Sequence, residues 1–185
     1  MGFDDHQQVS LEGSLILADP SLRESTFHRS VLLLTNHSPD EGAHGYILNR
    51  PTHRTVGDLI ESDSFEALCE IPVFMGGPVN TEQMTFSSLS WDENKEALNF
   101  EIHLSAKEAT QRLLEGFCVR AFIGYAGWSE GQLESELKQR AWITHRAEAC
   151  IANSDCLEDL WGDILRRMSP WHRLLADAPD DPSLN

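Results

Sequence analysis

Basic residues are scarce in this chain of 185 residues. Fourteen lysines and arginines stand against 30 aspartates and glutamates, so the formal net charge at pH 7 is −16. A negative field of this size repels phosphate backbones and anionic membrane surfaces. The densest basic cluster is Arg166, Arg167 and Arg173, and two aspartates lie close to it in the sequence. Direct binding to nucleic acid or to a membrane is therefore not expected.

The sequence also lacks cysteine pairs and long apolar runs. None of its four cysteines (Cys69, Cys118, Cys150 and Cys156) forms a C-x-x-C motif, which argues against a zinc knuckle or a redox dithiol and favours reduced thiols. No apolar run approaches the ~20 residues that a membrane helix needs. The first twelve residues have no cationic start followed by an apolar segment, so we predict no signal peptide and expect a cytoplasmic protein.

Hydrophobic residues make up 41% of the chain and charged residues 24%, which are ordinary values for a folded domain. Because the sequence has no internal repeat and no linker-like segment, we predict a single domain over residues 1–185. Its ends, 1–12 and 176–185, are polar or acidic and are expected to be flexible tails.

Short apolar runs predict most of the strands. Residues 31–35 and 46–48 flank a polar segment rich in turn formers, which indicates a hairpin. In residues 97–104, apolar and polar side chains alternate, as in a strand with one solvated face. Further strands are predicted at residues 14–18, 71–75, 84–89, 117–124, 141–144 and 149–152.

Capping boxes mark two of the predicted helices. Ser105 with Glu108, and Ser129 with Gln132, have the spacing at which each side chain bonds to the other residue's backbone. A third helix is predicted over residues 155–168 from its apolar stripe, and a short helical segment over 55–60. Since strands occur both in hairpins and beside helices, the sheet is expected to be mixed.

Several sequence blocks occur together in an order that is similar to the AlgH/YqgE family. The blocks are GSLILADP at 13–20, FHRSV at 27–31, GAHGYILNRP at 42–51, GGPV at 76–79, GYAGW at 124–128 and GQLE at 131–134. They extend the resemblance from about Gly13 to Trp161, which is nearly the whole domain.

This resemblance implies an α+β fold, with a bifurcated mixed sheet that partly closes into a small barrel and is surrounded by helices. It also implies a bacterial cytoplasmic protein, and some members of the family have been described as transcriptional regulators. No activity and no catalytic residue accompany the resemblance. Besides glycines and prolines, the blocks single out Arg29, Asn49, Arg50, Tyr125, Trp128 and Gln132.

Ser129 lies in a G-x-S-x-G pattern at residues 127–131, which is typical of a hydrolase nucleophile between a strand and a helix. A hydrolase would also need an acid and a histidine, for which the chain offers Asp155 or Asp159 with His172 or His145. The same serine is explained by helix capping with Gln132, which needs no catalytic partner. We favour capping and keep an esterase-like hydrolase as the alternative.

Polar residues at strand ends form the second candidate site. Arg29, Asn49 and Arg50 lie at the edges of predicted strands, from which they reach solvent or bond to loop carbonyl groups. Gly77 lies in a tight turn where backbone amides could approach an anion, although neither a dinucleotide nor a phosphate-loop motif is present. Tyr125 and Trp128 are candidate walls of a pocket, or core residues.

The remaining titratable residues indicate neither a metal nor a cofactor. His37, His44 and His53 do not have the spacing of metal ligands, and solvated loop positions are the simpler interpretation. We therefore expect a non-enzymatic binding or regulatory module for a small anionic ligand, a peptide or a protein partner. The candidate binding residues are Arg29, Asn49, Arg50, Gly77, Tyr125 and Trp128. An enzyme using Ser129 and a DNA-binding regulator are the alternatives.

Overall fold

The computed structural model describes residues 10–22, 26–38, 40–60, 63–153, 157 and 159–178. Its elements follow one another in chain order as β1 (Leu15–Ala18), β2 (Val31–Ser38), β3 (Gly42–Ile47), β4 (Pro51–Thr55), η1 (Asp63–Leu68), β5 (Pro72–Met75), β6 (Val79–Asp92), β7 (Ala97–Leu104), α1 (Ala106–Leu114), β8 (Cys118–Trp128), α2 (Gln132–Lys138), β9 (Trp142–His145), η2 (Ala149–Ala152), α3 (Leu160–Met168) and α4 (Pro170–Asp177).

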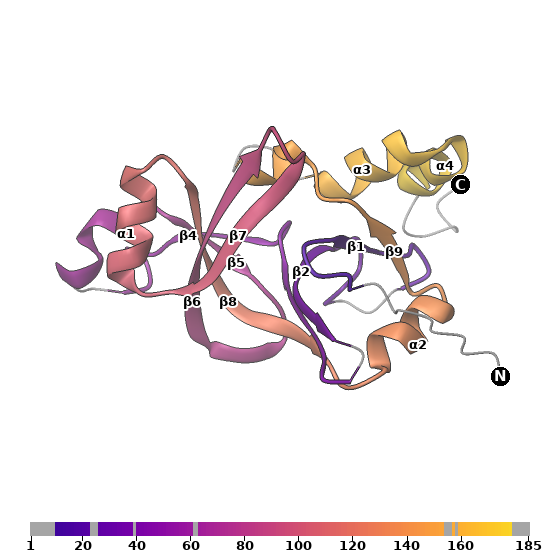
Figure 1. Ribbon diagram of the computed structural model, residues 1–185, viewed down its shortest axis with the longest axis horizontal. Helices are drawn as coiled ribbons and strands as arrows, with labels where there is room; N and C mark the ends of the chain where they lie inside the picture. The colour runs from indigo at the N-terminus through magenta and orange to yellow at the C-terminus, as the bar shows by residue number, and fades with distance from the viewer. Residues whose placement is uncertain are drawn as a thin grey trace.

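The sheet is mixed and it branches at β8. Its main path runs β4-β5-β8-β3-β2-β1-β9, and β6 also pairs with β8 and carries β7. The pair β5·β8 is parallel, whereas the other pairs are antiparallel. Figure 1 shows α1 at one end of the curved sheet and α2, α3 and α4 at the other. The predicted α+β fold with a mixed, bifurcated and partly closed sheet is confirmed.

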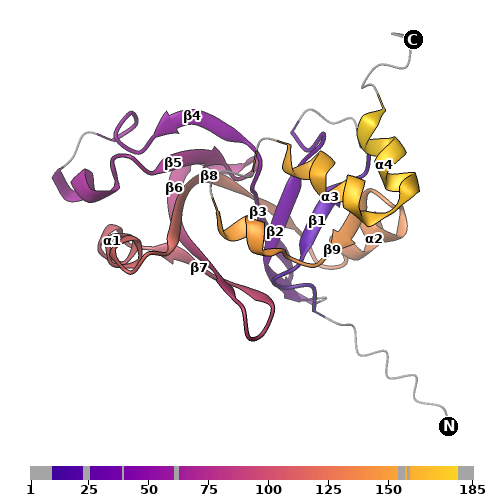
Figure 2. The ribbon, with the colours of Figure 1, turned by 90° about the horizontal axis from the view of Figure 1, so that it is seen from above.

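Three apolar clusters fill the space around this sheet. The first packs α3 against β1, β2 and β8, and includes Leu17, Phe122 and Ile164. The second lies beneath α2 on the opposite face of β1 and β2. The third joins α1 and η1 to β5, β6 and β8 at the far end of the molecule. The view from above in Figure 2 separates the end that carries α1 from the end that carries α3 and α4.

Local sequence signals fix some elements well. The Ser105 hydroxyl accepts a hydrogen bond from the Glu108 amide, and the Glu108 carboxylate accepts one from the Ser105 amide, as the capping box predicts. The hairpin of β2 and β3 and the alternating strand β7 are also present.

Other local predictions are wrong. Residues 149–152 form the 3₁₀ helix η2 instead of a strand, and residues 56–59 form a turn after β4 instead of a helix. α2 begins at Gln132 with Gly131 as its N-cap, so Ser129 lies before the helix. The predicted C-terminal tail begins inside α4, and residues 1–9 and 179–185 lie outside the described residues.

Candidate functional site

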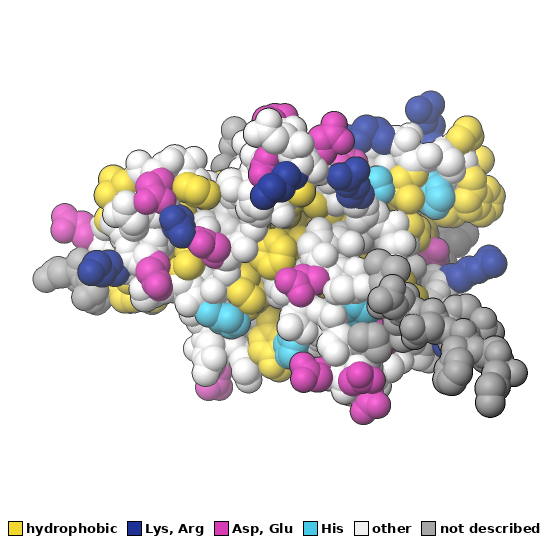
Figure 3. Space-filling model, viewed as in Figure 1, with side chains coloured by type: hydrophobic (Ala, Val, Ile, Leu, Met, Phe, Trp, Pro, Cys, Tyr) yellow, Lys and Arg dark blue, Asp and Glu magenta, His cyan; other side chains and the backbone are white. Residues whose placement is uncertain are grey.

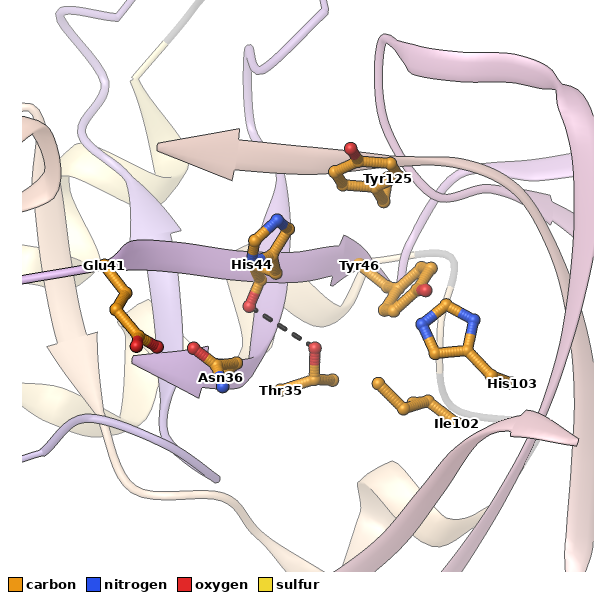
Figure 4. Close-up of a pocket in the computed structure, with 8 residues that line it drawn as sticks. All are labelled: Thr35, Asn36, Glu41, His44, Tyr46, Ile102, His103 and Tyr125. Atoms are coloured by element: carbon orange, nitrogen blue, oxygen red, sulfur yellow. Dashed lines mark hydrogen bonds between the residues drawn. The ribbon is translucent and has the colours of Figure 1, made fainter. Parts of the chain in front are cut away.

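A cavity of about 430 Å³ lies where β2, β3, β7 and β8 meet. It is lined by Thr35 and Asn36 of β2, Glu41 of the following turn, His44 and Tyr46 of β3, Ile102 and His103 of β7, and Tyr125 of β8. Figure 4 shows Glu41 at one end of this group and His103 at the other, with His44 and the two tyrosines between them. A cavity of this volume suits a small organic molecule.

A β-bulge in β2 shapes one wall of the cavity. Leu34 pairs with Gly45 and Asn36 pairs with His44, so that Thr35 is the extra residue between two consecutive pairs. A bulge of this kind bends the strand and redirects its side chains. The Thr35 hydroxyl donates to the His44 carbonyl oxygen at 3.4 Å, which ties the bulge to β3 (Figure 4). The bulge therefore places Thr35 and Asn36 together at the cavity.

Two tyrosines form the aromatic part of the cavity. Tyr46 is 4% exposed and its ring packs 5.0 Å from that of Phe122. Burial raises the pKa of Tyr46; a hydrogen bond with Thr85 opposes this effect, and nearby Tyr125 adds to it. The Tyr46 phenol is therefore neutral at physiological pH. The Tyr125 ring lies 5.4 Å from the His44 imidazole, tilted by 42°.

His103 is held in an unusual backbone conformation. Its φ is +59°, in the left-handed region that residues with a side chain rarely adopt. Such strain occurs often, although not only, at binding sites. The side chain is exposed and lines the cavity together with Ile102. Among the residues that line the cavity, Glu41 is the one carboxylate, and lysine and arginine are absent.

The described residues contain no group of three or more His, Cys, Asp or Glu side chains placed to hold a metal ion. The cavity instead offers hydroxyl, amide and imidazole groups for hydrogen bonding, and aromatic faces for stacking. This arrangement suits the binding of a planar polar molecule.

Arg29, Asn49 and Arg50 do come together, but they hold neighbouring backbone segments. The Asn49 side chain donates to the Arg29 carbonyl oxygen and accepts from the Val31 amide, both at 2.9 Å. Arg50 donates to the His28 carbonyl oxygen. Arg29 donates to the Ala178 carbonyl oxygen at 3.0 Å. The three side chains thus fasten the segment before β2 to the end of β3 and to the C-terminal end of α4.

Arg50 and Gly77 line a second cavity of about 290 Å³, together with Met75 and neighbouring residues. The tight approach at Gly77 has a structural cause, because a Cβ there would collide with the backbone of Tyr125. Tyr125 itself lines the first cavity. The residues predicted as one binding face are therefore divided between separate places.

Trp128 lies in the core. It is 6% exposed, packs edge-on against Trp142, and its indole N–H donates to the Glu136 carboxylate at 2.8 Å. The same Glu136 oxygen accepts the Trp142 indole N–H at 2.7 Å. Of the two aromatic residues predicted as pocket walls, only Tyr125 lines the 430 Å³ cavity.

Ser129 has the partners of a structural residue. Both its hydroxyl and its amide donate to the Gln132 side-chain oxygen, at 3.1 and 3.0 Å. His172 is bonded to Ser169, and His145 to Glu148. Among the described residues, no histidine is hydrogen-bonded to Ser129. Asp155, one of the two candidate acids, lies outside the described residues. The geometry of this segment gives a hydrolase no general base.

Sequence reasoning did not single out most of the cavity. His44 was interpreted as a solvated loop histidine, whereas it lies on β3 beside Tyr125. His103 and Ile102 come from the distant strand β7, and their approach to β3 depends on the curvature of the sheet.

The fold and the cavity together define an α+β protein with a branched sheet and a small-molecule-sized pocket at the branch. The chain belongs to the AlgH-like family, which it matches over residues 15–173. A UPF0301 protein of Streptomyces coelicolor is 37% identical over 95% of this chain and 96% of its own length. A UPF0301 protein of Chlorobium luteolum is 30% identical over 99% of this chain and 98% of its own length. The predicted family is confirmed, and these relatives are bacterial.

Two solved structures share the fold. A crystal structure of a Corynebacterium diphtheriae protein superposes with a TM-score of 0.71 at 22% identity, covering 92% of this chain and 93% of its own. The solution structure of AlgH from Pseudomonas aeruginosa superposes with a TM-score of 0.62 at 24% identity, covering 93% of this chain and 96% of its own. Within the described part of this chain, no helix is long and apolar enough to cross a membrane.

Proposed function

We propose that this protein is a binding module whose ligand is a small planar molecule without a negative charge, held in the cavity between His44 and Tyr125. The observation that carries the proposal is the lining of that cavity. It combines two tyrosine rings, two imidazoles, and the hydroxyl and amide groups of Thr35 and Asn36, all carried by four strands. A ligand ring stacks on the aromatic faces, and its polar edge bonds to Thr35 and Asn36.

The charge of the cavity supports a neutral or cationic ligand. Glu41 lies at one end, and the lining contains no lysine or arginine. A carboxylate and tyrosine faces both attract a cation and repel an anion. In the surface view of Figure 3, histidine side chains flank an exposed apolar strip in the middle of the molecule, with acidic side chains close by. The anionic ligand expected from the arginines is therefore less well supported than a heterocycle or an aromatic amine.

A binding role is also better supported than ester hydrolysis, since the Ser129 hydroxyl and amide donate to the Gln132 side chain and no histidine is bonded to Ser129 among the described residues. The test is a ligand screen by ¹H–¹⁵N NMR with small heterocycles, including purines, pyrimidines, indoles and nicotinamide. We expect positively charged or neutral members to shift the amide signals of His44, Tyr125 and His103.

Variants distinguish this cavity from the second one. His44→Ala removes one wall and should weaken the binding of a screening hit by about tenfold, the effect of losing one stacking contact or hydrogen bond. Met75→Ala is the matched control, because Met75 is 37% exposed and lines the 290 Å³ cavity but not the 430 Å³ one. Hits that respond to Met75→Ala and not to His44→Ala, or a screen in which no signal from the cavity moves, would refute the proposal.

A further inference from the structure

Three buried polar atoms without a partner lie on one pair of neighbouring residues. Among the described residues, four buried side-chain nitrogen or oxygen atoms lack a hydrogen bond, namely Oγ of Ser30, Oγ of Ser87, and Nε and Nη1 of Arg120. Ser87 of β6 is directly opposite Arg120 of β8 in the antiparallel pair. Opposed residues of such a pair project from the same face of the sheet, with Cβ atoms about 5 Å apart.

Arg120 is enclosed by the protein. Its side chain has no exposed surface, and its Nη2 group donates to the carbonyl oxygens of Ile151 and Asn153, at 2.7 and 3.0 Å. The guanidinium also lies 5.7 Å from the centre of the Phe74 ring. No carboxylate of the described residues forms an ion pair with it. Arg120 thus holds η2 and the residue after it against the sheet through two backbone carbonyl oxygens.

This environment leaves a positive charge without a compensating negative one. Burial lowers the pKa of Arg120 from its ordinary value, while the neighbouring thiols of Cys118 and Cys150 oppose that shift. Arginine nevertheless stays protonated in proteins, so the charge persists. Because buried charges and buried N–H groups are costly without partners, the arrangement favours the uptake of an anion.

A cavity lies beside the backbone that Arg120 holds. A third cavity, of about 360 Å³, is lined by Cys118, Ala152, Asn153 and residues of β5, β8 and the α1–β8 turn. Asn153 is the residue whose carbonyl oxygen accepts from Arg120. Cys118 shares a sheet face with Arg120, because alternate residues of a strand point the same way. Arg120 and Ser87 do not line this cavity, so the guanidinium lies behind the wall that Cys118 and Asn153 form.

We propose that Ser87 and Arg120 form a binding site for one small monovalent anion of about the size of chloride, reached from the cavity beside Cys118. The ion accepts hydrogen bonds from the Ser87 hydroxyl and from Nε of Arg120, the guanidinium nitrogen nearest to the backbone. Bound there, it neutralises the buried charge and strengthens the attachment of η2 to β8. This site is separate from the cavity of His44 and Tyr125, with which it shares no lining residue.

Bromide tests the site because it replaces chloride and scatters X-rays anomalously. Crystals of the full-length protein, soaked in bromide, should show an anomalous peak within hydrogen-bonding distance of the Ser87 hydroxyl and of Nε of Arg120. A peak at other places only, or an ordered water between these two groups with no anomalous signal, would overturn the proposal.

Solution measurements then separate specific binding from binding at crystal concentrations. At constant ionic strength, replacing gluconate with bromide should raise the melting temperature of the wild type in a saturable way. Ser87→Ala removes one donor and should weaken the apparent affinity for bromide by about tenfold. Ser30→Ala is the matched control, since it deletes another buried unpaired hydroxyl on the segment before β2. Equal bromide dependence in all three proteins would refute the assignment, even if Arg120→Gln does not fold.

Discussion

Replacing Glu136 by alanine should destabilise the protein by about 2–6 kcal/mol. One oxygen of its carboxylate accepts both indole N–H groups, from Trp128 at 2.8 Å and from Trp142 at 2.7 Å. The two tryptophans are only 6% and 5% exposed, so water replaces the lost acceptor poorly. Each buried donor left without a partner costs about 1–3 kcal/mol, and two donors give the stated range.

Urea unfolding at pH 7, followed by circular dichroism, measures this loss. Glu130→Ala is the control, because Glu130 is exposed in the turn before α2. Trp128→Phe removes the indole N–H of Trp128, so that only the Trp142 indole N–H still needs Glu136 as its acceptor. A loss below about 0.5 kcal/mol for Glu136→Ala, within the range of ordinary surface substitutions, would show that the two indoles do not depend on this carboxylate.

Two further predictions concern acid stability and a glycine. Burial raises the pKa of Glu148, but bonding to His145 and Arg167 outweighs it, so the pKa falls below its ordinary value of 4.5. Glu148 therefore adds stability that is present above its ordinary pKa of 4.5 and is lost as the pH falls through the lowered value. Glu148→Gln should remove this loss, so that the free energy of unfolding of the variant falls less steeply below the ordinary pKa of 4.5. Gly124→Ala should cost about 1–3 kcal/mol more than Gly131→Ala in urea unfolding, since both glycines have a φ of +66° but only at Gly124 would a Cβ meet backbone oxygens. An equal loss of unfolding free energy in the two variants would contradict the clash expected at Gly124.

Local chemistry explains why part of the fold is predictable. The Ser105–Glu108 box and the alternation of β7 depend on neighbours in the sequence, and both are found as predicted. η2 was predicted as a strand because the apolar residues 149–152 fit either structure, and its actual form is secured by Arg120, a residue about 30 positions away. Non-local bonds of this kind leave no local pattern.

The candidate cavity was also hard to predict from local sequence patterns. Its lining residues come from four strands and one turn, and the bulge at Thr35 becomes visible only when β2 is paired with β3. Tyr125 is the only one of the six predicted binding residues that lines it. Arginines at strand ends suggested an exposed face, but backbone carbonyl oxygens satisfy them in the folded chain.

The branching of the sheet at β8 has a consequence for how the chain folds. β8 pairs with β3, β5 and β6, and the early strand β1 pairs with β9, which follows β8 in the chain. Most of these partners are far apart in sequence, and the loops between them must close before their contacts stabilise anything. Folding should therefore be slow compared with a helical protein of equal length. A nascent chain emerging from the ribosome cannot complete either half of the sheet until β8 has been synthesised.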